Sequence, residues 1–143
     1  MSKKLIILLV ALLLMLFGCT AEQSNQDPWS MDMVTSMGGS QEDLTVQELE
    51  YQIDISYIGS NNVEIVDIEP LISKEPAVRA RITEESQQVV EKESTNMSVE
   101  GKLIISTGEL TKKQIEEIGP FITGVTISWQ ENGQIHETTK SLQ

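Results

Sequence analysis

The chain has 143 residues, the size of one ordinary domain, and carries 22 acidic but only 10 basic residues, for a net charge of −12. This excess of negative charge argues against binding to nucleic acid or anionic lipid headgroups, and it fits either a solubilising surface or a basic partner. With one cysteine and one histidine, the chain can form neither an internal disulfide nor a metal site built on two histidines.

The first residues combine a short positive segment with an apolar run. Lys3 and Lys4 precede residues 5–17, which are almost all Leu, Ile, Val and Met, and small Gly18 closes the run before Cys19. A run of about 13 apolar residues is shorter than the roughly 20 that span a bilayer. The pattern is that of a secretory signal. The alternative is an uncleaved helix in which Cys19 is a buried structural residue.

The end of this run, Leu16-Phe17-Gly18-Cys19, resembles the lipobox of bacterial lipoproteins. The resemblance implies that residues 1–18 are a signal peptide cut just before Cys19, and that Cys19 is lipidated with a diacylglyceryl group. Two acyl chains hold a protein stably at a bilayer, whereas one holds it only marginally. The expected location is therefore the cell membrane, with the chain lipid-anchored on its extracytoplasmic face.

Residues 19–44 follow as an acidic segment rich in Ser, Asn, Gln and Gly. Such a composition buries too little apolar surface to order itself, so we expect a flexible tether. A chain beginning near Gln41 should then fold as well as the mature protein. Two alternatives concern Trp29 and the three methionines Met31, Met33 and Met37: an apolar element that docks on the domain or on a partner, or a soft-metal site.

Strands are predicted from Thr45 onward. Apolar and polar residues alternate over 49–57, and a second strand over 63–68 changes phase between Ile65 and Val66, which indicates a bulge. Alternation over 78–83 predicts a third strand. Residues 84–98 fit a short helix or an edge strand, and β-branched Val89-Val90 favours the strand.

The last third of the chain contains a strand, a short helix and a hairpin. Residues 99–106 form a clear strand, and Thr111 with Gln114 fits the capping box of a helix that Gly119-Pro120 ends. A strand over 121–129 is joined by the Asn132-Gly133 turn to a final strand, in which Ile135 is expected to face inward. The residues expected to be mostly buried are Val63, Ile65, Leu103, Ile105, Val125, Ile127 and Trp129.

Several short strands separated by turns predict a mostly β fold, an immunoglobulin-like β-sandwich with one short crossover helix, over residues 45–143. The sequence resembles immunoglobulin-like or fibronectin-type-III-like domains of exported bacterial proteins. The resemblance rests on the Tyr51–Tyr57 strand with its Gly59–Asn62 turn, the Leu110–Ile118 crossover and the Trp129 hairpin. With the lipobox, the chain resembles small, mostly uncharacterised lipoproteins of Gram-positive bacteria, although the antibody-type Cys…Trp…Cys pattern is absent.

The sequence offers little for catalysis. His136 is expected to be an exposed strand residue, because a lone histidine needs oriented partners to act as a base. Four acids, Asp54, Glu64, Asp67 and Glu69, are candidates for a glycosidase pair or for calcium ligands. They alternate outward on strands, and no Asp-x-Asp-x-Asp-Gly loop is present. We therefore expect no catalytic residue, no metal site and no cofactor.

The sequence thus predicts a non-enzymatic, membrane-anchored binding or accessory domain. Its partners would be the membrane, through Cys19, and an envelope protein or wall component, but not nucleic acid. The alternative is an ion- or ligand-binding surface sensor, for example for calcium. The oligomeric state stays open.

Overall fold

The computed structural model describes residues 27–39, 45–108 and 110–142. Cys19, the predicted signal peptide and part of the predicted tether lie outside these residues. The described elements are β1 (Trp29–Gly38), β2 (Val46–Tyr57), β3 (Val63–Ile72), α2 (Pro76–Arg79), β4 (Ile82–Lys92), β5 (Asn96–Ser106), α3 (Lys112–Glu117), β6 (Ile122–Glu131) and β7 (Gln134–Ser141). The fold is mostly β, as predicted.

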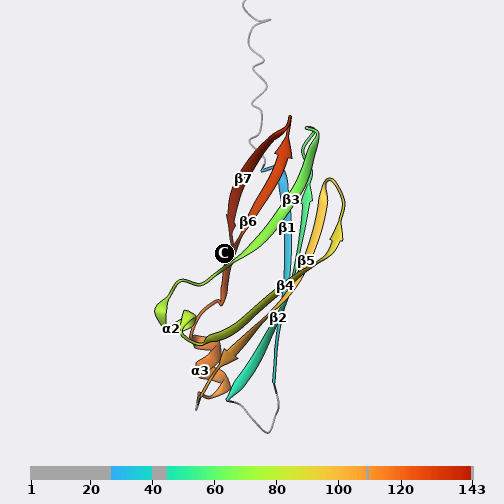
Figure 1. The fold of residues 1–143 in the computed structure, drawn as a ribbon. Coiled ribbons are helices and arrows are strands. Elements are labelled where there is room, and N and C mark those ends of the chain that lie inside the picture. The colour runs from blue at the N-terminus through green and yellow to red at the C-terminus, as the bar shows by residue number, and fades with distance from the viewer. Residues whose placement is uncertain (1–26, 40–44, 109, 143) are drawn as a thin grey trace, which may run out of the picture.

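The strands form two antiparallel sheets that lie face to face (Figure 1). Sheet A has the strand order β1-β2-β5-β4, and sheet B has the order β3-β6-β7. Both helices lie near one end of the sandwich, below sheet B in Figure 1. Some neighbouring strands are therefore distant in sequence, as β2 and β5 are in sheet A and β3 and β6 are in sheet B.

Alternating side chains from both sheets fill the space between them. Ile53 and Ile55 of β2 face Val99 and Met97 of β5 across the strand pair, and all four are buried. Sheets A and B both contribute residues that the sequence predicts to be buried, and six of the seven are buried, while Trp129 is partly buried and packs against the core. The buried members of that set are Val63, Ile65, Leu103, Ile105, Val125 and Ile127.

The predicted bulge in β3 is present. The pairing of β3 with β6 shifts between Ile65 and Asp67, so that Ile65 and Ile68 are both fully buried although three residues apart. Two side chains from β4 bind the β3 backbone here: Gln87 Nε2 donates to the Ile68 carbonyl at 2.7 Å, and Lys92 Nζ donates to the Val66 carbonyl at 3.2 Å. These contacts join sheets A and B along one side of the sandwich.

The expectation of a flexible tether is wrong for residues 29–38. They form β1, which pairs with β2 without interruption from Trp29 opposite Tyr57 to Gly38 opposite Glu48. Composition alone missed the strand because its polar residues alternate with Trp29, Met31 and Met33, whose side chains turn toward the core. The domain therefore includes β1, which precedes the start at Thr45 that the sequence predicted.

Other local expectations have mixed outcomes. The predicted third strand over 78–83 is wrong: Pro76 starts the short helix α2, and buried Val78 packs inward from that helix. Ile135 does not face inward, because it is 63% exposed on β7. The strand assignment for residues 84–98 is confirmed by β4 and the start of β5, with a short connection between them.

The predicted helix and hairpin are confirmed. Thr111 accepts a hydrogen bond from the Gln114 N–H, and Gln114 Oε1 accepts one from the Thr111 N–H at 2.9 Å, which is the capping box of α3. Asn132 and Gly133 both have positive φ, as the tight turn between β6 and β7 requires. There are, however, two short helices in the described residues, since α2 accompanies the one predicted.

Because β1 is part of the fold, a chain beginning at Gln41 should be clearly less stable than one beginning at Thr20. Trp29→Ala alone should lower the free energy of unfolding by about 3–5 kcal/mol, because the ring is only 6% exposed. Met37→Ala, at the exposed end of the same strand, is the control and should stay within about 0.5 kcal/mol. Denaturant unfolding of the chain from Thr20, the chain from Gln41 and the two variants gives the comparison, and equal stability of the two chains would restore the tether interpretation.

Candidate functional site

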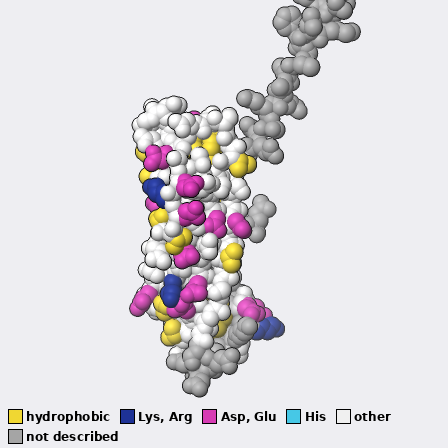
Figure 2. Space-filling view, turned by 90° about the vertical axis from the view of Figure 1, so that its right-hand side faces the viewer, with side chains coloured by type: hydrophobic (Ala, Val, Ile, Leu, Met, Phe, Trp, Pro, Cys, Tyr) yellow, Lys and Arg dark blue, Asp and Glu magenta, His cyan; other side chains and the backbone are white. Residues whose placement is uncertain are grey.

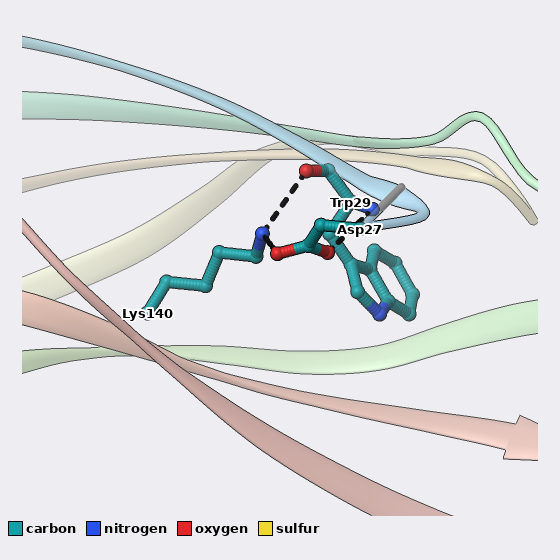
Figure 3. A network of polar contacts seen from close by, with 3 residues as sticks. All are labelled: Asp27, Trp29 and Lys140. Carbon is teal, nitrogen blue, oxygen red and sulfur yellow. Dashed lines mark hydrogen bonds and ion pairs between the residues drawn. The ribbon is translucent and has the colours of Figure 1, made fainter. Parts of the chain in front are cut away.

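Asp27 and Lys140 fasten the start of β1 to β7 (Figure 3). Lys140 Nζ forms an ion pair with the Asp27 carboxylate and donates to the Trp29 carbonyl at 3.2 Å, while the Trp29 N–H donates to Asp27 Oδ1 at 3.1 Å. The hydrogen bond from Lys140 has the largest effect on the Asp27 carboxyl; partial burial opposes it and the Trp29 N–H adds to it. The net result is a pKa of Asp27 below its ordinary value of 3.8.

Aromatic rings continue this connection through the sandwich. The centroid of the Trp29 ring lies 4.9 Å from the ring centroid of Tyr57 in its own sheet and 4.9 Å from that of Trp129 in the opposite sheet. His136 stacks on Trp129 with ring centroids 5.6 Å apart. His136 is therefore half-buried and not the exposed residue that the sequence predicted. Its ring packs against the face of the Trp129 ring.

The structure does not bring together the four acids that the sequence offers as candidates. Glu64, Asp67 and Glu69 are exposed on β3 of sheet B. Asp54 lies on the outer face of sheet A, where the Ser98 hydroxyl and Gln52 Nε2 donate to it. The core separates these two positions, so a carboxylate pair flanking one substrate is not formed by Asp54 with any of the other three.

The methionines of β1 do not converge either. Met31 and Met33 pack against the core, which agrees with the docking alternative for this segment. Along an extended strand, Met31 and Met37 lie about 20 Å apart, too far to share one ion. Among all the residues that the structure describes, no group of three or more His, Cys, Asp and Glu side chains is arranged to hold a metal ion.

The outer face of sheet A carries many acidic side chains. Figure 2, which looks onto the side at the right of Figure 1, shows acidic side chains along its length. Strand register puts one set of acids on this face: Asp32, Glu48, Glu50, Asp54, Glu84, Glu91 and Glu100. Lys102 lies among them and forms an ion pair with Glu48, which raises the pKa of the lysine.

A hollow of about 580 Å³ lies on this face and touches all four strands of sheet A. Val34 and Ser36 line it on β1, and Glu50 and Glu100 line it on β2 and β5. A second hollow, of about 670 Å³, lies beyond Tyr51, near the end of β3 and α2. Tyr51, Ser86 and Gln87 line both hollows and so separate them.

Gly101 makes this arrangement possible. A Cβ at Gly101 would overlap the Tyr51 ring and would lie 2.6 Å from the Ser86 carbonyl oxygen. Without it, the Tyr51 ring lies across β5, and its hydroxyl donates weakly toward Ser86 O and Gln87 on β4, at 3.5 and 3.4 Å. Burial, helped by the nearby Glu85 charge, raises the Tyr51 pKa above 10.0. The hydroxyl therefore stays a neutral donor at neutral pH.

Comparison of the chain with protein-family models, curated proteins and solved structures finds no match. In the described part of the chain, neither helix has the length and apolar composition needed to cross a bilayer. The sequence could have indicated the acidic face through the alternation of Glu48, Glu50, Gln52 and Asp54 along β2. The hollow cannot be recognised in the sequence, because it is lined by four strands that come from separate parts of the chain.

The Asp27–Lys140 pair should make stability depend on pH. Because the Asp27 pKa is lowered on folding, its contribution is present above pH 3.8 and is lost as the pH falls below that value. Asp27→Asn should therefore lower the free energy of unfolding at about pH 7, by less than about 1 kcal/mol because the carboxylate is largely exposed. At about pH 3 the difference from the wild type should shrink.

Glu64→Gln is the control, since it removes one negative charge from an exposed position on β3. Urea unfolding of the three proteins at both pH values gives the comparison. A stability difference for Asp27→Asn that is the same at both pH values would show that the carboxylate does not bind Lys140 in solution.

Proposed function

We propose that the chain is a lipid-anchored extracytoplasmic protein whose single immunoglobulin-like domain binds a protein or wall component and has no enzymatic activity. Support for the fold family comes from strand order. If β1 to β7 are taken as strands A to G, the two sheets read ABED and CFG, the arrangement of constant-type immunoglobulin domains. Buried Ile53 and Ile127 lie on the B and F strands, the strands that a disulfide joins in antibody domains.

The membrane anchor is supported by the Leu16–Cys19 lipobox and the preceding apolar run. The revised start of the domain changes the expected geometry. Cys19 is eight positions before Asp27, so at most about 29 Å of chain separates the lipid from the sandwich. The Asp27 end of β1 would then face the membrane, while the Gly38 end, about 30 Å further along the strand, would point away from it.

The single observation that favours a binding role is the acidic, hollowed outer face of sheet A. It is open along four strands, and it collects much of the excess negative charge of the chain on one side. Acidic groups on such a face repel anionic headgroups and attract basic surfaces. An anchored domain with this face exposed is suited to hold a basic partner near the membrane.

The anchor is tested by replacing the proposed lipid attachment site. Cys19→Ser should abolish incorporation of an alkyne-labelled fatty acid and release the protein from the membrane fraction, because it removes the acceptor thiol. Thr20→Ser, the neighbouring residue with similar chemistry, should keep both. Protease added to intact cells should degrade the domain only if it lies outside the cytoplasm.

Two results would count against the proposal. Firm membrane association of Cys19→Ser would indicate that the apolar run is itself an anchor. Full protection of the domain from protease in cells whose outer layers have been removed would indicate that it is not extracytoplasmic.

A further inference from the structure

One edge of β1 carries backbone groups with no strand partner in the described part of the chain. Backbone groups along an antiparallel strand point alternately toward its partner and away from it. The Ile58 N–H donates to the Pro28 carbonyl at 2.7 Å, so the Pro28 carbonyl faces the β2 side. Even-numbered residues of β1 therefore direct their N–H and C=O toward β2, and odd-numbered residues direct theirs to the opposite edge. At Trp29 that edge is occupied by Lys140. At Met33, Thr35 and Met37 it is open, and residues Val34–Gly38 are all exposed.

The other sheet edges are protected in ways that β1 is not. The pairing of β4 is interrupted by two bulges, and its Gln87 and Lys92 side chains reach β3. The same two side chains also bind carbonyl groups on the β3 edge. The edge strand β7 carries the polar or charged residues His136, Glu137 and Lys140. Natural proteins use such bulges and charges to prevent unwanted strand pairing. β1 has ten regular pairs, no bulge, no proline and one charged residue, Asp32.

Charge next to this edge selects the kind of strand that fits. Ser36 lies opposite Glu50 and Gly38 lies opposite Glu48, so small β1 side chains leave both carboxylates accessible from the edge. Nearer the start of β1, Asp32 lies directly opposite Asp54, an arrangement of like charges that costs stability. A basic side chain added on the outer face beside β1 would be attracted to these carboxylates.

We propose that the open edge of β1 from Met33 to Gly38 binds an extended segment of another protein, with Lys or Arg at alternate positions, as a fifth strand of sheet A. Backbone hydrogen bonds to Met33, Thr35 and Met37 supply affinity, and the acids of the outer face supply selectivity. This inference rests on the proposed binding function and names the chemistry of its partner. A second copy of the chain fits less well, because its β1 would bring its own Asp32, Glu48 and Glu50 against the same acids.

The position of the edge suits this role. The open half of β1 lies at the end opposite the Asp27–Lys140 contact, and hence far from the proposed anchor. An added strand would also border the 580 Å³ hollow, because Val34 and Ser36 line the hollow on the β1 side. Outward side chains of the added strand could therefore extend over the hollow toward Glu50 and Glu100.

The test uses the full chain, isotope-labelled and purified in detergent, with two synthetic probes of about ten residues, a common length for a strand. One peptide alternates lysine with threonine, and the control peptide alternates glutamate with threonine. The lysine peptide should bind and should shift the amide signals of Met33, Thr35 and Met37, whereas the glutamate peptide should not. Binding should weaken as salt rises, because exposed charges are screened.

Two pairs of variants separate edge pairing from general attraction. Thr35→Pro removes an N–H that points away from β2, so the fold should keep its melting temperature while binding weakens about tenfold. Thr35→Val keeps the N–H and should bind within about twofold of the wild type. Glu50→Gln should weaken binding of the lysine peptide by about two- to fivefold, and Glu64→Gln, on the other sheet, should leave it unchanged.

Each remaining outcome would overturn the inference. Equal binding to Thr35→Pro and Thr35→Val would reduce the interaction to attraction by the acidic face. Dimers that Thr35→Pro dissociates would make a second copy the occupant, and protection of the Thr35 amide in the free chain would make it a segment of the same chain. If the lysine peptide did not bind although the Thr35 amide was unprotected, the inference would also be rejected. None of these results depends on Cys19, so a failure of the anchor would be recognised separately.

Discussion

The burial of Trp29 between the two sheets is the interaction on which the architecture depends. Its ring contacts Tyr57 in sheet A and Trp129 in sheet B, and its backbone carbonyl accepts a hydrogen bond from Lys140 of β7. A single residue thus fixes the first strand to both layers. If this contact were absent, the attachment of β1 to the core would depend on the Asp27–Lys140 pair and on the Met31 and Met33 side chains.

The position of β1 also determines what the domain offers to a partner. β1 forms the rim of the acidic outer face, and its far half extends beyond the contacts that hold its start. The same strand is therefore firmly attached at Trp29 and open from Met33 to Gly38. Because Asp27 is close in sequence to Cys19, the attached end is the one that the proposed lipid would hold near the membrane. If the proposed anchor is present, this order of residues would direct the open edge away from the membrane.

Much of this fold can be predicted from sequence, because local signals determine it. The alternation in β2, the capping box at Thr111 and the Asn132-Gly133 turn each act over a few residues, and each was correctly interpreted. β1 was missed because its apolar side consists of one tryptophan and methionines in a segment whose composition resembles a linker. α2 was missed because Val78 and Ile82 fit a strand period, although Pro76 begins a helical turn. The open edge and the hollow depend on non-local pairing, which one sequence does not reveal.

Residue-resolved amide hydrogen exchange along β1 is the most direct measurement of the central claim, that β1 is a strand of the domain with one open edge. The structure predicts an alternating pattern: the amides of Ser30, Asp32, Val34 and Ser36, which face β2, should be protected, and those of Met33, Thr35 and Met37 should exchange quickly. Rapid exchange of every amide from Trp29 to Gly38 would contradict the claim, because it would show an unpaired segment. Uniform protection would contradict the open edge.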